Sequence, residues 1–272
     1  MKRHGALMGI ALAVCSIGLA QDAGTERVVV PARNSTHPRK VIVNIMGGPI
    51  TVKAYNGREV IVETQGGSGT SRGDRREDRR ADGMKRLDLP QRGLSVEEDD
   101  NVVTVKMEHG LRGSGVTIST PAETALSLHT MSGEITVEGV KGEIDVNSMN
   151  GRINLTNVSG SVLAHSMNGP MKVVMDNVDA SKPLSFSTMN GTIDVTLPAN
   201  FKANAKIRTD HGEVYSDFDF KLNGGAITQK NDTSDGKFKV TMDKTITGTI
   251  NGGGAEVTLK TYNGTIYLRK GK

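Results

Sequence analysis

The chain has 272 residues, of which 36% are hydrophobic and 33 are glycine, whereas aromatic residues make up only 3% and tryptophan is absent. This composition excludes a disordered chain and predicts many short strands joined by tight turns, because Val and Ile are abundant. The formal net charge of +4 does not indicate a nucleic-acid-binding surface, since the basic residues are not clustered along the repeats described below.

Residues 1–20 have the features of a secretory signal peptide. A basic start at residues 2–4 precedes the apolar run Ala6–Ala20, which ends in small residues suited to cleavage before Gln21. The run is shorter than the roughly 20 apolar residues of a membrane-spanning helix. We therefore expect an exported protein, in the periplasm, at the cell surface or outside the cell, with no stable membrane span after cleavage.

The only cysteine, Cys15, lies inside this apolar run. A lipoprotein signal needs a small residue just before the modified cysteine, and Val14 does not fit, so we do not expect lipidation. Cleavage after Ala20 leaves a mature chain without cysteine, which excludes disulfides and thiolate chemistry. The stability of the exported chain must then come from the fold itself.

Residues 21–40 are expected to form an extended leader, and residues 41–272 a single β-repeat domain. Alternating apolar and polar residues over Val41–Ile45 and Leu94–Met107 predict strands in its first part. Between them, residues 67–93 contain eight basic residues, five acidic residues and almost no apolar side chains. This composition predicts a solvated, flexible insert, with a short exposed helix as the alternative.

Glycine recurs every nine residues through the centre of the domain, at positions 133, 142, 151, 160 and 169. Apolar residues stand two and four positions after each glycine, as in Ile135 and Val137 or Ile153 and Leu155, with polar residues between them. This period of two predicts strands that bury one face.

The full repeat is eighteen residues long, because the two nine-residue halves have different turn sequences. Met149-Asn150-Gly151 recurs as Met167-Asn168-Gly169, and Val140-Lys141-Gly142 recurs as Val158-Ser159-Gly160. This periodicity predicts an all-β fold, a β-solenoid or β-roll-like stack of short strands with 18-residue coils made of two 9-residue halves. Corresponding strands of successive coils would lie about 4.8 Å apart.

The turn sequences also give expectations about side chains. Asn-Gly and Ser-Gly dipeptides predict turns in which glycine adopts a positive φ. The Met or Val two positions before each glycine is expected to point inward, so that Met131, Met149, Met167 and Met189 form an interior column. Flexible methionine commonly fills gaps in cores, and a metal-binding methionine stripe is the functional alternative.

The repeat becomes less regular toward both ends. Tyr262-Asn263-Gly264 repeats the turn, as does Tyr55-Asn56-Gly57, although the apolar residues that follow Gly57 are one residue out of phase. Between residues 199 and 254, Asp210-His211-Gly212 and Ile246-Thr247-Gly248 resemble degenerate turns. This region is a candidate cap for an open end of the stack, which could otherwise self-associate edge to edge.

The acidic residues do not suggest an active site. Asp145 and Asp194 are separated in the register of the repeat, so they do not form the facing carboxylate pair of a glycoside hydrolase. No aspartate recurs in the turns, which argues against a ladder of calcium sites, and a single site at Asp145, Asp176 or Asp179 is the alternative. We assign no catalytic, cofactor-binding or metal-binding residues and expect no cofactor.

Two histidines occupy equivalent positions in the repeat. His129, Asn147 and His165 are eighteen residues apart, which predicts one outward polar column with the histidines about 10 Å apart. That separation is too long for a single zinc ion with bonds of about 2 Å.

The segments Thr130–Val137 and Ser148–Leu155 resemble the repeat of the bacterial "putative adhesin" family. The resemblance covers residues 41–66 and 94–268 and leaves out the charged insert. It implies an exported domain of repeated β-strands whose function is unknown, with adhesion suggested by the family's name. It carries no catalytic residues over to this chain.

We therefore predict a non-enzymatic exported protein with a structural, adhesion or interaction role at the cell envelope. Its expected partner is an envelope protein or a glycan, with self-association as a further possibility and no nucleic acid. One alternative is a polysaccharide-acting parallel β-helix enzyme, which would need acidic residues converging in one groove. The other is an envelope-stress or signalling accessory protein whose insert at residues 67–93 contacts an anionic lipid or a partner.

Overall fold

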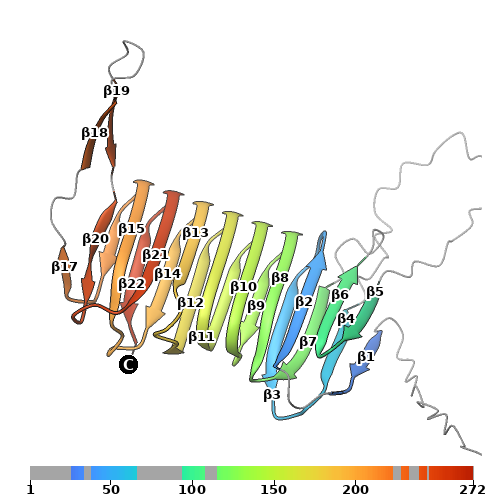
Figure 1. Cartoon of the computed structure of the whole chain (residues 1–272). Helices are drawn as coiled ribbons and strands as arrows, with labels where there is room; N and C mark the ends of the chain where they lie inside the picture. Colours follow the sequence, from blue (N-terminus) through green and yellow to red (C-terminus); the bar gives the residue numbers. More distant parts are fainter. Residues whose placement is uncertain are drawn as a thin grey trace, which may run out of the picture.

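The computed structural model describes residues 26–33, 38–65, 94–107, 115–222, 228–232, 239–243 and 245–271. The elements in these residues are all β-strands, which confirms the prediction of an all-β fold (Figure 1). Twenty strands form one mixed sheet, and β18 (Thr228–Asp232) pairs with β19 (Lys239–Asp243) in a separate hairpin. The predicted signal peptide (1–20), Cys15 and the charged insert (67–93) lie outside the described residues.

The sheet consists of two ladders of strands, and the long strand β11 (Ile153–Asn168) belongs to both. Across the stack, the first ladder contains β5 (Leu94–Asp99), β6 (Val102–Met107), β2 (Arg39–Ile45), β8 (Thr124–Ser132), β10 (Lys141–Asn150), β11, β13 (Leu184–Asn190), β21 (Ala255–Asn263), β15 (Ala203–His211), β20 (Ile246–Ile250) and β17 (Phe220–Leu222). The second contains β1 (Arg27–Val30), β4 (Val60–Gln65), β7 (Gly115–Pro121), β3 (Ile50–Tyr55), β9 (Ile135–Glu138), β11, β12 (Met171–Val178), β14 (Ile193–Leu197), β22 (Ile266–Lys270) and β16 (Val214–Ser216).

Parallel pairing in the centre follows the eighteen-residue repeat. Ile144 of β10 pairs with Leu126 of β8 and with Val162 of β11, eighteen residues away in each direction. Between β12 and β14 the offset grows to 22 residues, as in the pair of Met171 with Ile193. The extra residues form the turn after β12, so the strands on either side keep their inward and outward faces.

The layers are not stacked in chain order at either end. β2 and β3 lie between the pair β6 and β7 and the pair β8 and β9. Likewise, β21 and β22 lie between β13 and β14 on one side and β15 and β16 on the other. At each end, the layer next to the last parallel one therefore comes from a distant part of the sequence.

Antiparallel strands lie beyond the parallel layers. β4 pairs with β1 and β7, β5 with β6, and β20 with β15 and β17. Because β4 runs against its neighbours, its apolar residues do not follow the phase of the repeat. β1 and the start of β2 lie within residues 21–40, where an extended leader was expected, and β1 joins the sheet by pairing with β4.

Of the two degenerate turns predicted in the C-terminal region, only one is a turn in the structure. Asp210-His211-Gly212 is a turn of the stack, because Gly264 N donates a hydrogen bond of 2.9 Å to His211 O and the next layer begins there. Ile246-Thr247-Gly248 is not a turn. It lies inside β20, where Gly248 packs against Phe220, so that prediction was wrong.

The inward side chains of the two ladders form one hydrophobic cluster. Ile135, Val137, Ile153 and Leu155 are all completely buried, as the alternation after each glycine predicted. Phe186 of β13 is the largest of the fully buried side chains. The outer face of each ladder is therefore left to polar residues and to the few apolar residues that the core does not use.

Candidate functional site

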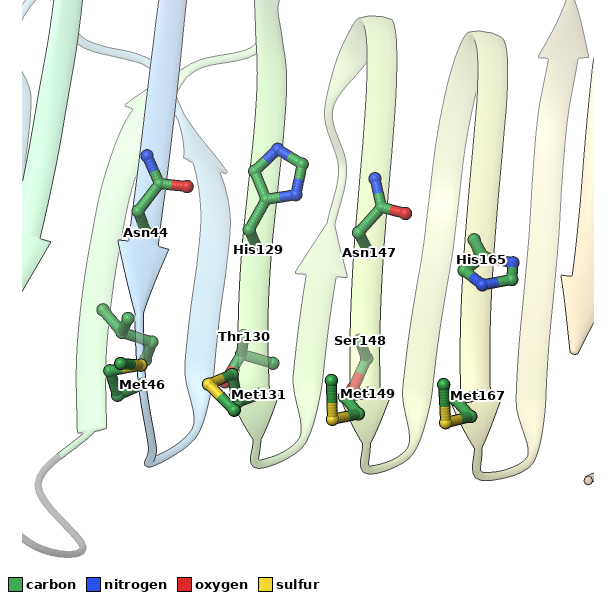
Figure 2. Close-up of a pocket in the computed structure, with 11 residues that line it drawn as sticks. Asn44, Met46, His129, Thr130, Met131, Asn147, Ser148, Met149, His165 and Met167 are labelled. Atoms are coloured by element: carbon green, nitrogen blue, oxygen red, sulfur yellow. The ribbon is translucent and has the colours of Figure 1, made fainter. Parts of the chain in front are cut away.

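A groove of about 400 Å³ lies on the outer side of the first ladder, where β2, β8, β10 and β11 are neighbours. Two rows of side chains cross these strands in Figure 2, one of Asn44, His129, Asn147 and His165 and the other of Met46, Met131, Met149 and Met167. Ile45, Thr130 and Ser148 complete the lining. The lining contains no lysine, arginine, aspartate or glutamate.

The methionine row of the groove points outward, which contradicts the expected interior column. Its four methionines are 40–50% exposed, and Met189 continues the row beyond the groove with 50% exposure. Strand alternation is the cause, because Leu128 and Thr130 of β8 are buried and Met131 therefore falls on the outer side. The inward corner positions are instead occupied by small hydroxyl residues, Thr130, Ser148 and Ser166 among them.

The second row of the groove confirms the predicted outward polar column. Asn44 pairs with His129, His129 with Asn147, and Asn147 with His165 in the parallel register. Hydrogen bonds hold these side chains on the surface: Asn147 Nδ2 donates to Asp145 Oδ1 at 3.0 Å. The same register gives each histidine strand a methionine two residues later on the same face.

Hydrogen bonds to serine orient both histidines. His129 Nε2 lies 3.1 Å from Ser127 Oγ, and His165 Nδ1 lies 2.8 Å from Ser187 Oγ. Each contact occupies one of the two ring nitrogens. The groove therefore presents two imidazoles, each in contact with a serine hydroxyl, beside thioethers. The sequence did not predict this combination, because the methionines were expected inside.

Glycine forms the corner that follows the methionine in each layer, two residues later in the sequence. Gly151 has a φ of 158° and Gly169 a φ of 156°, and a Cβ on either would lie 1.9–2.0 Å from the carbonyl oxygen of the equivalent glycine in the adjacent layer. Only glycine permits this approach of backbone to backbone. The positive φ predicted for these turn glycines is confirmed.

An asparagine ladder runs along the same corner. Asn168 Nδ2 donates to Asn150 Oδ1 at 2.9 Å, Asn190 Nδ2 to Asn168 Oδ1 at 2.7 Å, and Asn263 Nδ2 to Asn190 Oδ1 at 2.8 Å. These bonds tie successive layers together just beside the exposed methionines. The repeated Met-Asn-Gly tripeptide thus combines an outward methionine with two residues that hold the corner.

A second cluster of polar and aromatic side chains lies on the second ladder, at the C-terminal layers. Tyr215 and Tyr267 stack with ring centroids 5.4 Å apart, and Arg269 lies 5.2 Å from the centroid of Tyr267. The Tyr215 hydroxyl donates a hydrogen bond to Glu213, which raises the pKa of the phenol. Arg269 Nε donates to Asp194 Oδ1 at 2.7 Å, and this carboxylate raises the pKa of Arg269.

The acidic residues considered in the sequence lie apart. Asp145 is on the first ladder and Asp194 on the second. Asp179 accepts hydrogen bonds from the Ser181 hydroxyl and backbone N–H at 2.6 and 3.0 Å, and these bonds lower its pKa. The part of the chain that the structure describes contains no group of three or more His, Cys, Asp or Glu arranged to hold a metal ion.

No helix that could span a membrane occurs in the described ranges. A family model described as Toastrack DUF4097 matches residues 28–269, and no curated protein sequence matches the chain.

Solved structures that are similar to this chain include two bacterial proteins. One, described as a putative cell adhesion protein from Clostridium sporogenes, covers 91% of this chain and 100% of its own, with 10% identity and a TM-score of 0.44. The other, described as a putative adhesin from Bacteroides fragilis, covers 92% of this chain and 98% of its own, with 10% identity and a TM-score of 0.32.

Proposed function

This chain belongs to the toastrack DUF4097 family, and we propose that it is an exported, non-enzymatic interaction protein that binds a partner of the cell envelope through the groove of the first ladder. The match over residues 28–269 confirms the family resemblance read from segments such as Thr130–Val137. Export is inferred from the signal-peptide features of residues 1–20.

The exposed methionine row is the observation that carries the proposal. Single apolar side chains on a surface need no explanation, whereas a contiguous apolar strip marks an interaction surface. This row consists of Met46, which directly follows β2, and of methionines on the neighbouring strands β8, β10 and β11, namely Met131, Met149 and Met167. Each is about half exposed. Methionine also adapts to differently shaped partners, because its side chain is flexible and polarisable.

The chemistry of the lining defines the partner. Because the groove contains no lysine, arginine, aspartate or glutamate, it offers no charge to attract a strongly charged ligand. Thioethers provide apolar contact, and the row of asparagine and histidine side chains provides hydrogen bonds. We infer that the partner is an extended segment of an envelope protein with apolar side chains and uncharged polar groups.

We also propose that the central layers form a short β-solenoid with 18-residue coils, closed at both ends by antiparallel strands. The eighteen-residue offsets among β8, β10, β11 and β12 support this description. The antiparallel strands β4, β5 and β20 cover edges that would otherwise pair with other chains. Such a scaffold presents a rigid row of strands across which a partner can lie.

The proposal is tested by binding assays with the purified protein against envelope proteins, immobilised short peptides, cell-wall glycans and the protein itself. A variant carrying Met131→Ser, Met149→Ser and Met167→Ser should lose binding to apolar peptides and to its envelope protein. The matched control carries Thr136→Ala, Asn154→Ala and Lys172→Ala, a row on the outer side of the second ladder. It should bind as the unmodified protein does.

Binding that survives the serine substitutions would contradict the role of the groove. Binding to glycans alone, or hydrolysis of a polysaccharide, would contradict the proposal of a protein partner and a non-enzymatic role. Circular dichroism and thermal unfolding of each variant show whether the fold is retained, so that a loss of binding can be assigned to the surface.

A further inference from the structure

We propose that the groove holds soft monovalent metal ions, of the copper(I) and silver(I) class, between methionine thioethers and histidine imidazoles. We expect two sites, each with two methionine ligands and one histidine ligand. The first consists of Met46, Met131 and His129, and the second of Met149, Met167 and His165, all of which line the groove (Figure 2). This proposal goes beyond partner binding and does not depend on it.

The methionine sulfurs define the class of metal. Thioethers are soft ligands that suit copper(I), whereas Mg²⁺, Ca²⁺ and Mn²⁺ prefer carboxylate, carbonyl and water oxygens. The lining has no aspartate or glutamate, so hard cations find few of the oxygen ligands they need. Thioether and imidazole ligands are uncharged, and a monovalent ion leaves less uncompensated charge among them than a divalent one.

The spacing of the strands brings neighbouring sulfurs within reach of one ion. Paired strands lie about 4.8 Å apart, and two sulfurs held on one ion by bonds as long as a zinc–sulfur bond, about 2.3 Å, are at most about 4.6 Å apart. The parallel register sets Met46 beside Met131 and Met149 beside Met167. Because these side chains are about half exposed, their sulfurs can converge without any change in the core.

Each imidazole lies on the same face as its methionines, two residues before the second one. The contacts with Ser127 and Ser187 occupy Nε2 of His129 and Nδ1 of His165. They leave Nδ1 of His129 and Nε2 of His165 as the ligand atoms, and metal-binding histidines commonly have their second nitrogen held by such a hydrogen bond. Both rings line the groove, so rotation of the histidine side chains can direct these nitrogens to the methionine row while the strands stay in place, and the bound metal then replaces the serine contact of His129.

In each site only one of the two strands carries a histidine. Asn44 on β2 and Asn147 on β10 occupy the histidine row on the other strand of their site, and an amide is a poor ligand for a soft metal. The two histidine strands are two strand spacings apart, about 10 Å. That distance limits repulsion between two bound cations, so we expect one ion at each site.

The first test is a calorimetric titration of the purified protein with silver(I) in a chloride-free buffer, followed by a titration with copper(I) under reducing conditions against a competing chelator. Binding of about two ions is expected. Replacing His129→Asn and His165→Asn introduces the residue that β2 and β10 already carry in this row and should weaken silver binding by about tenfold or more. Unchanged affinity in this variant would overturn the assignment of imidazole ligands.

The second test separates sulfur chemistry from apolar contact. Met131→Leu with Met167→Leu keeps the side-chain volume close to that of methionine but removes one thioether from each site, and silver binding should be lost. Met189→Leu is the matched control, because Met189 is equally exposed in the same row but lies outside the groove. It should bind silver as the unmodified protein does.

Methyl NMR of the methionines provides a direct readout. The resonances of Met46, Met131, Met149 and Met167 should shift on addition of silver(I), while those of the buried Met171 and Met175 should not. Silver binding that persists in the leucine variant, or equal binding of zinc(II), would overturn the proposal. The leucine variant keeps an apolar groove, so its binding of a partner protein reports on the proposed function separately.

Discussion

The two sides of the first ladder follow different rules although they belong to the same strands. On the inner side, every layer from β2 to β15 presents buried aliphatic, alanine or phenylalanine side chains. On the outer side, the row that begins with Asn44 and His129 changes to Lys260 and Arg208 in the C-terminal layers. The core restricts inward positions to shapes that fill the stack, whereas outward positions are free to acquire specific chemistry.

The corner lies between these two sides and is nearly as restricted as the core. Its glycines approach the backbone of the next layer, and its asparagines bond to one another along the stack. The methionine that precedes each asparagine belongs to the outer side. The repeated Met-Asn-Gly tripeptide therefore combines positions with different constraints, and mutations should separate them.

The largest expected effect comes from the inner side. Phe186→Ala removes the largest fully buried side chain and should lower the free energy of unfolding by about 3–5 kcal/mol, through lost burial and the cavity left behind. Chemical denaturation measures the change. Ser185→Ala, one residue away on the outer side, should change stability by no more than about 0.5 kcal/mol; similar losses in both variants would remove the distinction between the sides.

At the corner, Gly151→Ala should destabilise the protein by about 2 kcal/mol, because a Cβ would lie 1.9 Å from Gly133 O and the backbone φ is positive. Gly252→Ala is the control for the backbone angle alone, since its φ is 90° with no atom within 4 Å of the added Cβ. Thermal and chemical denaturation should show the smaller loss in Gly252→Ala. Equal losses of stability in the two variants would mean that the close contact between the layers does not contribute to the cost of replacing Gly151.

Asn168→Ala should have an intermediate effect. It removes the hydrogen bonds to Asn150 and from Asn190, and because these groups are exposed the expected loss is about 1 kcal/mol. Asn147→Ala, in the outward row, loses only its contact with Asp145 and should be close to neutral. An unchanged midpoint of unfolding for Asn168→Ala would show that the ladder does not stabilise the stack.

The smallest effect on stability is expected on the outer side. Met149→Ser alters a side chain that is 40% exposed and should change the free energy of unfolding by no more than about 0.5 kcal/mol. Chemical denaturation of this variant, together with assays of partner and silver binding, should show that binding is lost while the fold is retained. A large loss of stability would mean that the methionine row serves packing rather than recognition.

Local rules were enough to predict much of the fold. The alternation after each glycine correctly identified Ile135, Val137, Ile153 and Leu155 as buried. The register of eighteen residues correctly placed His129, Asn147 and His165 in one outward row. These predictions succeed because side-chain direction along a strand and the need for glycine in a crowded turn are fixed by a few neighbouring residues.

The groove could not be predicted because the methionines were placed on the wrong side. Counting alternation onward from the buried Leu126 and Leu128, rather than assigning the corner separately, would have put Met131 outside. Even then, the strip of four methionines needs the tertiary arrangement, because Met46 is 85 residues from Met131 in the sequence and lies beside it only through the pairing of β2 with β8.

The sequence by itself determined where the strands and corners of the regular repeats lie, that the apolar residues two and four positions after each repeat glycine face the core, and the offset of eighteen residues between successive layers. Only the tertiary structure decided the order of the layers at the ends, where β6 and β7 lie outside β2 and β3 and where β21 and β22 lie inside β15 and β16. The physical reason is that alternation and turn preference act over a few residues, whereas neighbouring strands are selected by hydrogen bonding and packing between segments far apart in the chain. The groove across β2, β8, β10 and β11 depends on that selection.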